Sequence, residues 1–275
     1  MLIKKLSPHF GLEIHGIKLC TFDKMLFNKL KELLVEHQLL LIRNQSLTYE
    51  QYIKCASMLG QVTFYPFSLG LENHPEIVQI RKEPSQKNNF SGLWHVDSSY
   101  LDEPPDFTLL HAENTPPIGG DTVFSNTAQA FEALSPSLRE TLETLKCLYV
   151  SDLYNQDRTK HIANISQSKP LSAIHPAIIT HPTNLKKAIY VNEEHTHSFI
   201  GMTRTESVGL ISFLTSFIKR SEFTLRVSWE KGSLAIWDNR TTQHHAVNDY
   251  HGYLRVMNRI TVLDNGLNRT GFPGD

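Results

Sequence analysis

The sequence predicts a mostly β protein with flanking helices, organised as a single domain over residues 1–275. From Val62 onward, short apolar runs rich in β-branched and aromatic residues are separated by Pro, Gly and Asn. Few helical inserts interrupt these runs, so the order of elements favours a closed or double-sheet β architecture over repeated β-α-β units. The length of 275 residues agrees, because all-β folds of this size commonly form one domain.

The N-terminal part is expected to contain two helices around one buried strand. Phe22–His37 carries leucines at helical spacing, and Thr48–Leu59 begins at an N-capping threonine and stops at Gly60, a suitable C-cap glycine. Leu39–Ile42, between them, is an unbroken apolar run typical of a buried strand. Later strands are expected at Ile77–Ile80, Thr108–His111, Thr122–Phe124, Ala188–Val191, Leu225–Trp229, Leu234–Trp237 and Val256–Val262. Helical inserts are expected at Asn126–Leu134, Pro136–Leu145 and Arg204–Ile218.

Charge and cysteine content narrow the class of function. The formal net charge is −1, so nothing favours nucleic acid or an anionic membrane surface as a partner, and a small-molecule substrate is expected. No apolar stretch is long enough to span a bilayer or to form a secretory signal. The three cysteines lie far apart, which suits the reducing cytoplasm. The oligomeric state stays open, a homo-oligomer included.

A candidate metal site begins at the segment Trp94-His95-Val96-Asp97. On a strand, residues two apart face the same side, so His95 and Asp97 are expected to offer an imidazole and a carboxylate to one ion. This pattern is a weak signal in a chain with 14 histidines, but a further histidine, His244, follows the apolar run that ends at Trp237. Two histidines and one carboxylate are the facial ligand set of non-haem iron(II) oxygenases, which leaves room for a bidentate co-substrate and O2.

Arg255 adds a second signal, because it lies within an apolar strand segment. A buried guanidinium is costly unless it is paired, and the distal carboxylate of a keto-acid co-substrate would provide the pair. These features occur in a longer series of motifs that resembles the taurine/2,4-D (TauD/TfdA) dioxygenase family of iron(II)- and 2-oxoglutarate-dependent oxygenases. The resemblance extends from Leu39 to Val262. Its motifs are Trp94–Asp97, Pro116–Thr122, His175-Pro176, Tyr190–Asn192, Gly201-Met202 and Trp237–Arg259.

The resemblance implies a double-stranded β-helix, a jelly roll with a cupin-like core. It implies Fe(II), 2-oxoglutarate and O2 as cofactor and co-substrates, and C–H oxidation, most simply hydroxylation, with release of succinate and CO2. The residues it assigns are His95, Asp97 and His244 for the metal, Thr122 and Arg255 for 2-oxoglutarate, and Arg259, Ser91, Tyr65 and His195 for a small anionic substrate. Substrate-contacting His, Tyr, Asn and Phe of the taurine enzyme are replaced by Tyr65, Ser68, Ser91 and His195, which argues against taurine itself.

Several alternatives stay open at this point. The same oxidant desaturates, cleaves or decarboxylates amino-acid-derived substrates in some relatives. Arg259 could instead pair internally with Asp249 or Asp238. A metal-binding β-barrel without turnover would have no need for Thr122 and Arg255 together, and a zinc hydrolase would lack an evident general base.

Overall fold

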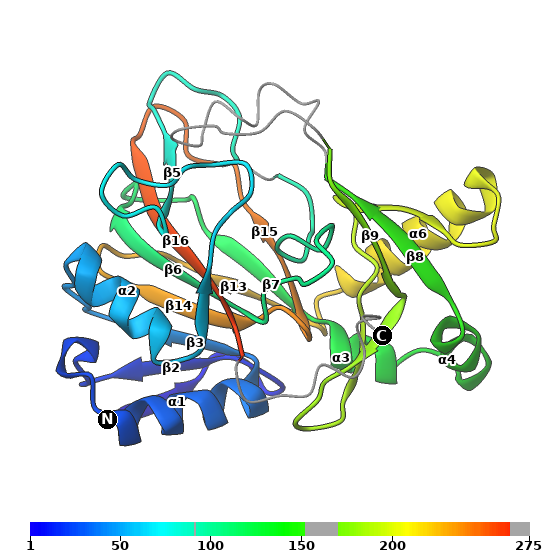
Figure 1. Ribbon diagram of the computed structural model, residues 1–275, viewed down its shortest axis with the longest axis horizontal. Coiled ribbons are helices and arrows are strands. Elements are labelled where there is room, and N and C mark those ends of the chain that lie inside the picture. The colour runs from blue at the N-terminus through cyan, green and yellow to red at the C-terminus, as the bar shows by residue number, and fades with distance from the viewer. Residues whose placement is uncertain (91, 152–169, 265–275) are drawn as a thin grey trace.

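The computed structural model describes residues 1–90, 92–151 and 170–264, and a large mixed sheet is its central element (Figure 1). Eight strands form this sheet, in the order β1-β2-β3-β14-β6-β16-β4 with β5 joined to β16. Their bounds are β1 (Leu2–Lys5), β2 (Leu12–His15), β3 (Leu39–Ile42), β4 (Gln61–Thr63), β5 (Val78–Lys82), β6 (Phe107–Asn114), β14 (Leu234–Asp238) and β16 (Arg255–Leu263). All pairs are antiparallel except β2 with β3.

A smaller sheet of three strands, β13-β7-β15, packs against one face of the large sheet. Its strands are β7 (Thr122–Asn126), β13 (Thr224–Val227) and β15 (Thr242–Ala246). A hydrophobic cluster joins the two sheets through Leu41, Ala235, Trp237 and Met257 of the large sheet and Phe124, Leu225 and Val227 of the small one. The predicted mostly β class is therefore confirmed, in its double-sheet form: within the described residues the strands do not close into a barrel.

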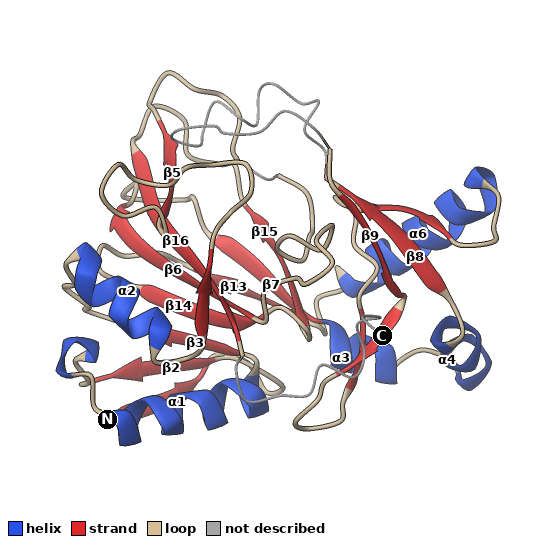
Figure 2. Cartoon of the chain, in the orientation of Figure 1, coloured by secondary structure: helices blue, strands red, loops and turns tan. Residues whose placement is uncertain are grey.

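Two helices, α1 (Lys24–His37) and α2 (Tyr49–Ser57), cover the other face of the large sheet through a separate apolar cluster (Figures 1 and 2). The side chain of Asp23 caps the N-terminus of α1, and Thr48 forms a capping box at α2. Gly60 is not the left-handed C-cap that was expected, because α2 ends at Met58 in right-handed conformation. Glycine is needed there because a Cβ would collide with the carbonyl of Leu263.

A third apolar cluster lies beside the sandwich and contains the helical inserts. It packs α3 (Thr127–Glu132), α4 (Pro136–Glu143) and α6 (Arg204–Ile218) with β8 (Lys146–Val150), β12 (Thr196–Phe199) and the hairpin of β10 (Ile178–Thr180) and β11 (Lys187–Ile189). Strand β9 (Ser172–Pro176) pairs with β8. A short 3-10 helix, η1 (Leu19–Thr21), precedes α1. Across the described ranges, no helix combines the length and apolarity needed to cross a membrane.

Candidate active site

His95, Asp97 and His244 lie together at the small sheet. The backbone brings the two histidines face to face, because each N–H donates to the other's carbonyl at 3.1 Å in an isolated antiparallel bridge. One potential ligand atom from each of the three residues lies within 4.8 Å of the others, and all three side chains are buried. Segments separated by about half of the chain thus supply an N,N,O donor set of the kind that binds first-row transition metals.

The local backbone around Asp97 differs from the expected strand. Only His95 makes a bridge; Asp97 already belongs to a turn that continues through Tyr100, with Ser98 at a positive φ of 51°. The alternation of side chains along a strand therefore does not determine the direction of the Asp97 carboxylate. Its direction is set instead by side chains from two strands of the large sheet.

Two hydrogen bonds fix the carboxylate of Asp97. Thr108 Oγ1 on β6 donates to Oδ2 at 2.7 Å, and Arg259 Nη1 on β16 donates to Oδ1 at 3.0 Å. Burial alone would raise the pKa of Asp97, but the charge of Arg259, the two nearby histidines and the Thr108 hydroxyl outweigh burial and lower the pKa to about 2. Asp97 is consequently an anion at any physiological pH, as a metal ligand must be.

The two imidazoles have different surroundings. His95 Nδ1 lies 2.9 Å from the carbonyl oxygen of Leu93 and 3.5 Å from a carboxylate oxygen of Glu194, while its Nε2 lies 3.7 Å from Asp97 Oδ1. Such an outer contact orients a metal-binding histidine and leaves its other nitrogen for the ion. Burial, followed by the charge of His95, holds the pKa of His244 well below its usual value. Its Nδ1 is buried and has no hydrogen-bond partner among the described residues.

The neighbouring histidine on β15 lies elsewhere. The ring of His244 stacks on Phe124 with centroids 5.8 Å apart, whereas the ring of His245 stacks on Trp94 at 5.8 Å. Adjacent strand residues point to opposite faces, and His244 alone of the two belongs to the candidate metal group.

Arg255 is a buried cation with no acidic partner in the part of the chain that the structure describes. Its side chain is 6% exposed, its guanidinium carbon lies 5.8 Å from the ring centre of Tyr250, and its Nε makes no hydrogen bond. Burial lowers the pKa of Arg255, and the influence of Tyr250 and Asp121 opposes this only in part. Thr122 follows Asp121 at the start of β7, and its hydroxyl accepts a hydrogen bond from Trp229 Nε1 at 3.0 Å.

Three of the residues expected to contact substrate lie close to the candidate metal ligands, namely Arg259, Tyr65 and His195. Arg259 pairs with neither Asp249 nor Asp238 but with Asp97, and its guanidinium carbon lies 4.6 Å from the ring centre of Tyr65. The ring of His195 lies 6.0 Å from that of His95.

Ser68 and Ser91 complete the set of expected substrate contacts. Ser91 lies outside the described residues. The hydroxyl of Ser68 accepts from the backbone N–H of Gly70 at 3.0 Å, so it stabilises a turn.

Three residues near the site had no signal in the sequence that singled them out. Glu194 faces His95, and Tyr100 packs edge-on against His195 with ring centroids 4.8 Å apart. Lys82 on β5 lies directly opposite Arg255 on β16. Turns and strand pairing bring these side chains to the site, so no spacing motif marks them.

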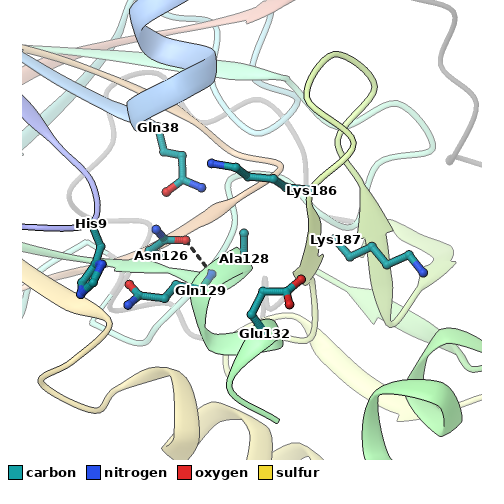
Figure 3. A pocket seen from close by; sticks show the side chains of 8 residues that line it. All are labelled: His9, Gln38, Asn126, Ala128, Gln129, Glu132, Lys186 and Lys187. Carbon is teal, nitrogen blue, oxygen red and sulfur yellow. Dashed lines mark hydrogen bonds between the residues drawn. The ribbon is translucent and has the colours of Figure 1, made fainter. Parts of the chain in front are cut away.

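A surface cavity of about 400 Å³ lies elsewhere in the molecule (Figure 3). It contains none of the metal group. Its lining residues are His9, Gln38, Asn126, Ala128, Gln129, Glu132, Lys186 and Lys187. Asn126 has a structural role there, because its side chain accepts from the N–H of Gln129 at 2.9 Å and caps α3.

Comparison with known proteins agrees with this geometry. Residues 2–261 match the family described as taurine catabolism dioxygenase TauD, TfdA family. The chain is 32% identical over 260 residues to an alpha-ketoglutarate-dependent sulfonate dioxygenase of Saccharomyces cerevisiae, covering 90% of this chain but only 63% of the yeast protein. It is 31% identical to an alkylsulfatase of Acinetobacter baylyi, covering 94% of this chain and 84% of that one. A taurine dioxygenase structure from Burkholderia xenovorans superposes with a TM-score of 0.82 at 30% identity, covering 98% of this chain and 93% of that one.

Proposed function

The chain belongs to the TauD/TfdA family of alpha-ketoglutarate-dependent dioxygenases, and we propose that it uses iron(II) to oxidise a C–H bond of a small organic sulfonate or sulfate ester. One observation carries the proposal: the buried His95, Asp97 and His244 group accompanies the buried Arg255, which forms no ion pair within the described residues. We also propose that residues 1–275 form a single catalytic domain, which the family match over 2–261 supports.

Iron(II) fits the donor set of the site. Asp97 supplies a carboxylate oxygen, and His95 and His244 supply imidazole nitrogens, without a thiolate that would favour a softer ion. The unbonded Nδ1 of His244 shows that its imidazole is not fully committed to protein partners. The contacts of His95 with Leu93 and Glu194 and those of Asp97 with Thr108 and Arg259 hold two of the ligands in place.

2-Oxoglutarate fits the part of the site that contains Arg255 and Thr122. Its distal carboxylate would neutralise Arg255, and a bidentate guanidinium–carboxylate contact is among the strongest polar contacts available to a protein. Thr122 would add a hydroxyl to the same carboxylate, with its oxygen oriented by Trp229. Without such an anion, the burial of Arg255 would be a net cost to the fold.

The anionic end of the substrate would bind beside Arg259. Its Nη1 is used by Asp97, but its Nη2 is buried without a hydrogen-bond partner among the described residues. Tyr65 below the guanidinium and His195 next to His95 would form the remaining walls. Sulfonates and sulfate esters carry the charge that this arrangement selects, and the yeast and Acinetobacter relatives bear names that refer to the same chemistry.

With iron(II) and 2-oxoglutarate bound, O2 would be the oxidant: oxidative decarboxylation of 2-oxoglutarate to succinate and CO2 would supply two of its four electrons, and hydroxylation of the substrate C–H bond the other two. The chain's own contribution is binding and position. Arg255 and Thr122 orient the co-substrate, Arg259 places the substrate anion, and Asp97 keeps its charge. The rings of Phe124 and Trp237 pack against His244 and limit the access of water to the metal-binding side chains.

A substrate screen tests the proposal. Purified protein with iron(II), ascorbate and 2-oxoglutarate is incubated with alkyl sulfonates, alkyl sulfate esters and matched alkyl carboxylates, and succinate is measured. We expect sulfonates or sulfate esters to stimulate succinate release above the substrate-free rate. Tight metal binding without succinate from any compound would favour a non-catalytic metal-binding protein, and stimulation by the alkyl carboxylates alone would refute the proposed substrate class.

A further inference from the structure

Lys82 is a second buried cation next to the proposed co-substrate anchor. It lies on β5 directly opposite Arg255 on β16, and its side chain is only 4% exposed. Residues directly opposite in an antiparallel pair extend to the same face, and like charges in such positions destabilise the sheet. This pair therefore requires compensation from an anion or from strong polar contacts.

The hydrogen-bond and ring contacts of Lys82 within the described residues are with uncharged groups, and Asp249 attracts its charge only from beyond ion-pair distance. Its Nζ donates to Asn248 Oδ1 at 2.6 Å and lies 4.1 Å from the ring centre of Tyr250. The guanidinium carbon of Arg255 lies 5.8 Å from the centre of that same ring. An amide oxygen and an aromatic face ease the burial of one cation, but they do not neutralise two.

The nearby carboxylates are already paired with another cation. Asp121 accepts from Arg226 Nε at 2.5 Å, and Asp249 accepts from Arg226 Nη2 at 2.8 Å. Lys82, Arg226 and Arg255 thus bring three positive charges against the two negative charges of Asp121 and Asp249. One positive charge is left over, which is the charge that one ligand carboxylate neutralises.

We propose that Lys82 is a co-substrate-binding residue that acts with Arg255 on the distal carboxylate of 2-oxoglutarate and thereby selects a dicarboxylic keto acid over a monocarboxylic one. Two cations extending from paired strands flank one carboxylate from two directions. A keto acid without the distal carboxylate gains nothing from either cation. The role of Lys82 is therefore specific to that end of the ligand.

Calorimetric titration tests this role without turnover. Manganese(II)-loaded protein is titrated with 2-oxoglutarate and, separately, with pyruvate, which keeps the keto-acid end and lacks the distal carboxylate. We expect Lys82→Met to weaken 2-oxoglutarate about tenfold or more and to leave pyruvate within about twofold. Lys82→Gln, which keeps a donor for Asn248, should behave like Lys82→Met. The control is Lys87→Met, since Lys87 is exposed and meets Asn248 only through its backbone carbonyl.

The outcomes separate this inference from the proposed function on which it rests. If wild type binds 2-oxoglutarate and both Lys82 variants bind it equally well, Lys82 has no role in the pocket and the dioxygenase proposal stands. If both variants lose 2-oxoglutarate and pyruvate alike, the lysine supports the fold rather than the distal carboxylate, and the inference is wrong. If wild type does not bind 2-oxoglutarate at all, the proposed function itself fails.

Discussion

Replacement of Arg255 by glutamine should have opposite effects on ligand affinity and on the stability of the ligand-free protein. Glutamine has an amide in place of the guanidinium and can still donate hydrogen bonds. In the presence of co-substrate, the change removes one partner of a buried charge pair, which typically costs about 2–5 kcal/mol, or roughly 30-fold to several-thousand-fold in affinity. Lys82 stays nearby, so we expect the lower half of this range.

The ligand-free protein should respond in the other direction. Arg255 is 6% exposed and forms no ion pair among the described residues, so the cost of burying its charge is offset only in part, by Tyr250 and Asp121. Arg255→Gln should therefore leave the Tm of the metal-free, ligand-free protein unchanged or raise it. Most substitutions of a buried residue lower stability, by about 0.5–3 kcal/mol, so this sign is informative.

Both effects are measurable on one preparation. Calorimetry with manganese(II)-loaded protein gives the Kd for 2-oxoglutarate, and thermal denaturation gives the Tm. Arg81→Gln is the matched control, because Arg81 lies on the adjacent strand β5 and is exposed, paired only with exposed Glu83. An unchanged Kd in Arg255→Gln would show that another cation anchors the co-substrate, and a lower Tm would show that Arg255 is already compensated within the protein.

Three further outcomes follow from the site. His244→Ala should abolish iron-dependent succinate formation and His245→Ala should retain it, as a turnover assay with equal protein loading would show; the reverse result would exchange the ligand assignment. Arg259→Ala should raise KM for the anionic substrate about 30-fold or more while the Kd of 2-oxoglutarate changes little; equal losses of both would assign Arg259 to the pairing with Asp97 alone. Burial lowers the pKa of His175 and His244 in the folded state. The unfolded chain therefore takes up protons first as pH falls through about 6.5. The free energy of unfolding of the metal-free protein should then fall by up to about 1.4 kcal/mol per pH unit for each histidine. Denaturant titrations at pH 7.5 and 5.5 would contradict this if the free energy of unfolding did not fall.

The elements that the sequence predicted well are those whose signals are local. Leu39–Ile42 and Arg204–Ile218 match β3 and α6, because an unbroken apolar run and a capped apolar stripe need no distant partner to be recognised. Strands β9 and β12 were missed, since they are short and lack a strong apolar run. Their pairing is decided by neighbours that are distant in the sequence.

The site shows the same division between local and distant information. The motif His95-Val-Asp97 was visible as a spacing, but the turn that holds Asp97 was not, because Thr108 and Arg259 fix it from other strands. The isolated character of Arg255 was inferred from its apolar surroundings alone. The position of Lys82 beside Arg255 could not be inferred from the sequence, because only the register of β5 with β16 places the two residues opposite each other.

Anaerobic absorption spectroscopy shows directly whether His95, Asp97 and His244 hold iron(II) together with 2-oxoglutarate. Addition of iron(II) and 2-oxoglutarate to the metal-free protein should produce a weak metal-to-ligand charge-transfer band in the visible. Neither component should produce the band alone, and His244→Ala should lack it. A wild-type protein that is saturated with iron(II) and 2-oxoglutarate and shows no band would contradict the claim.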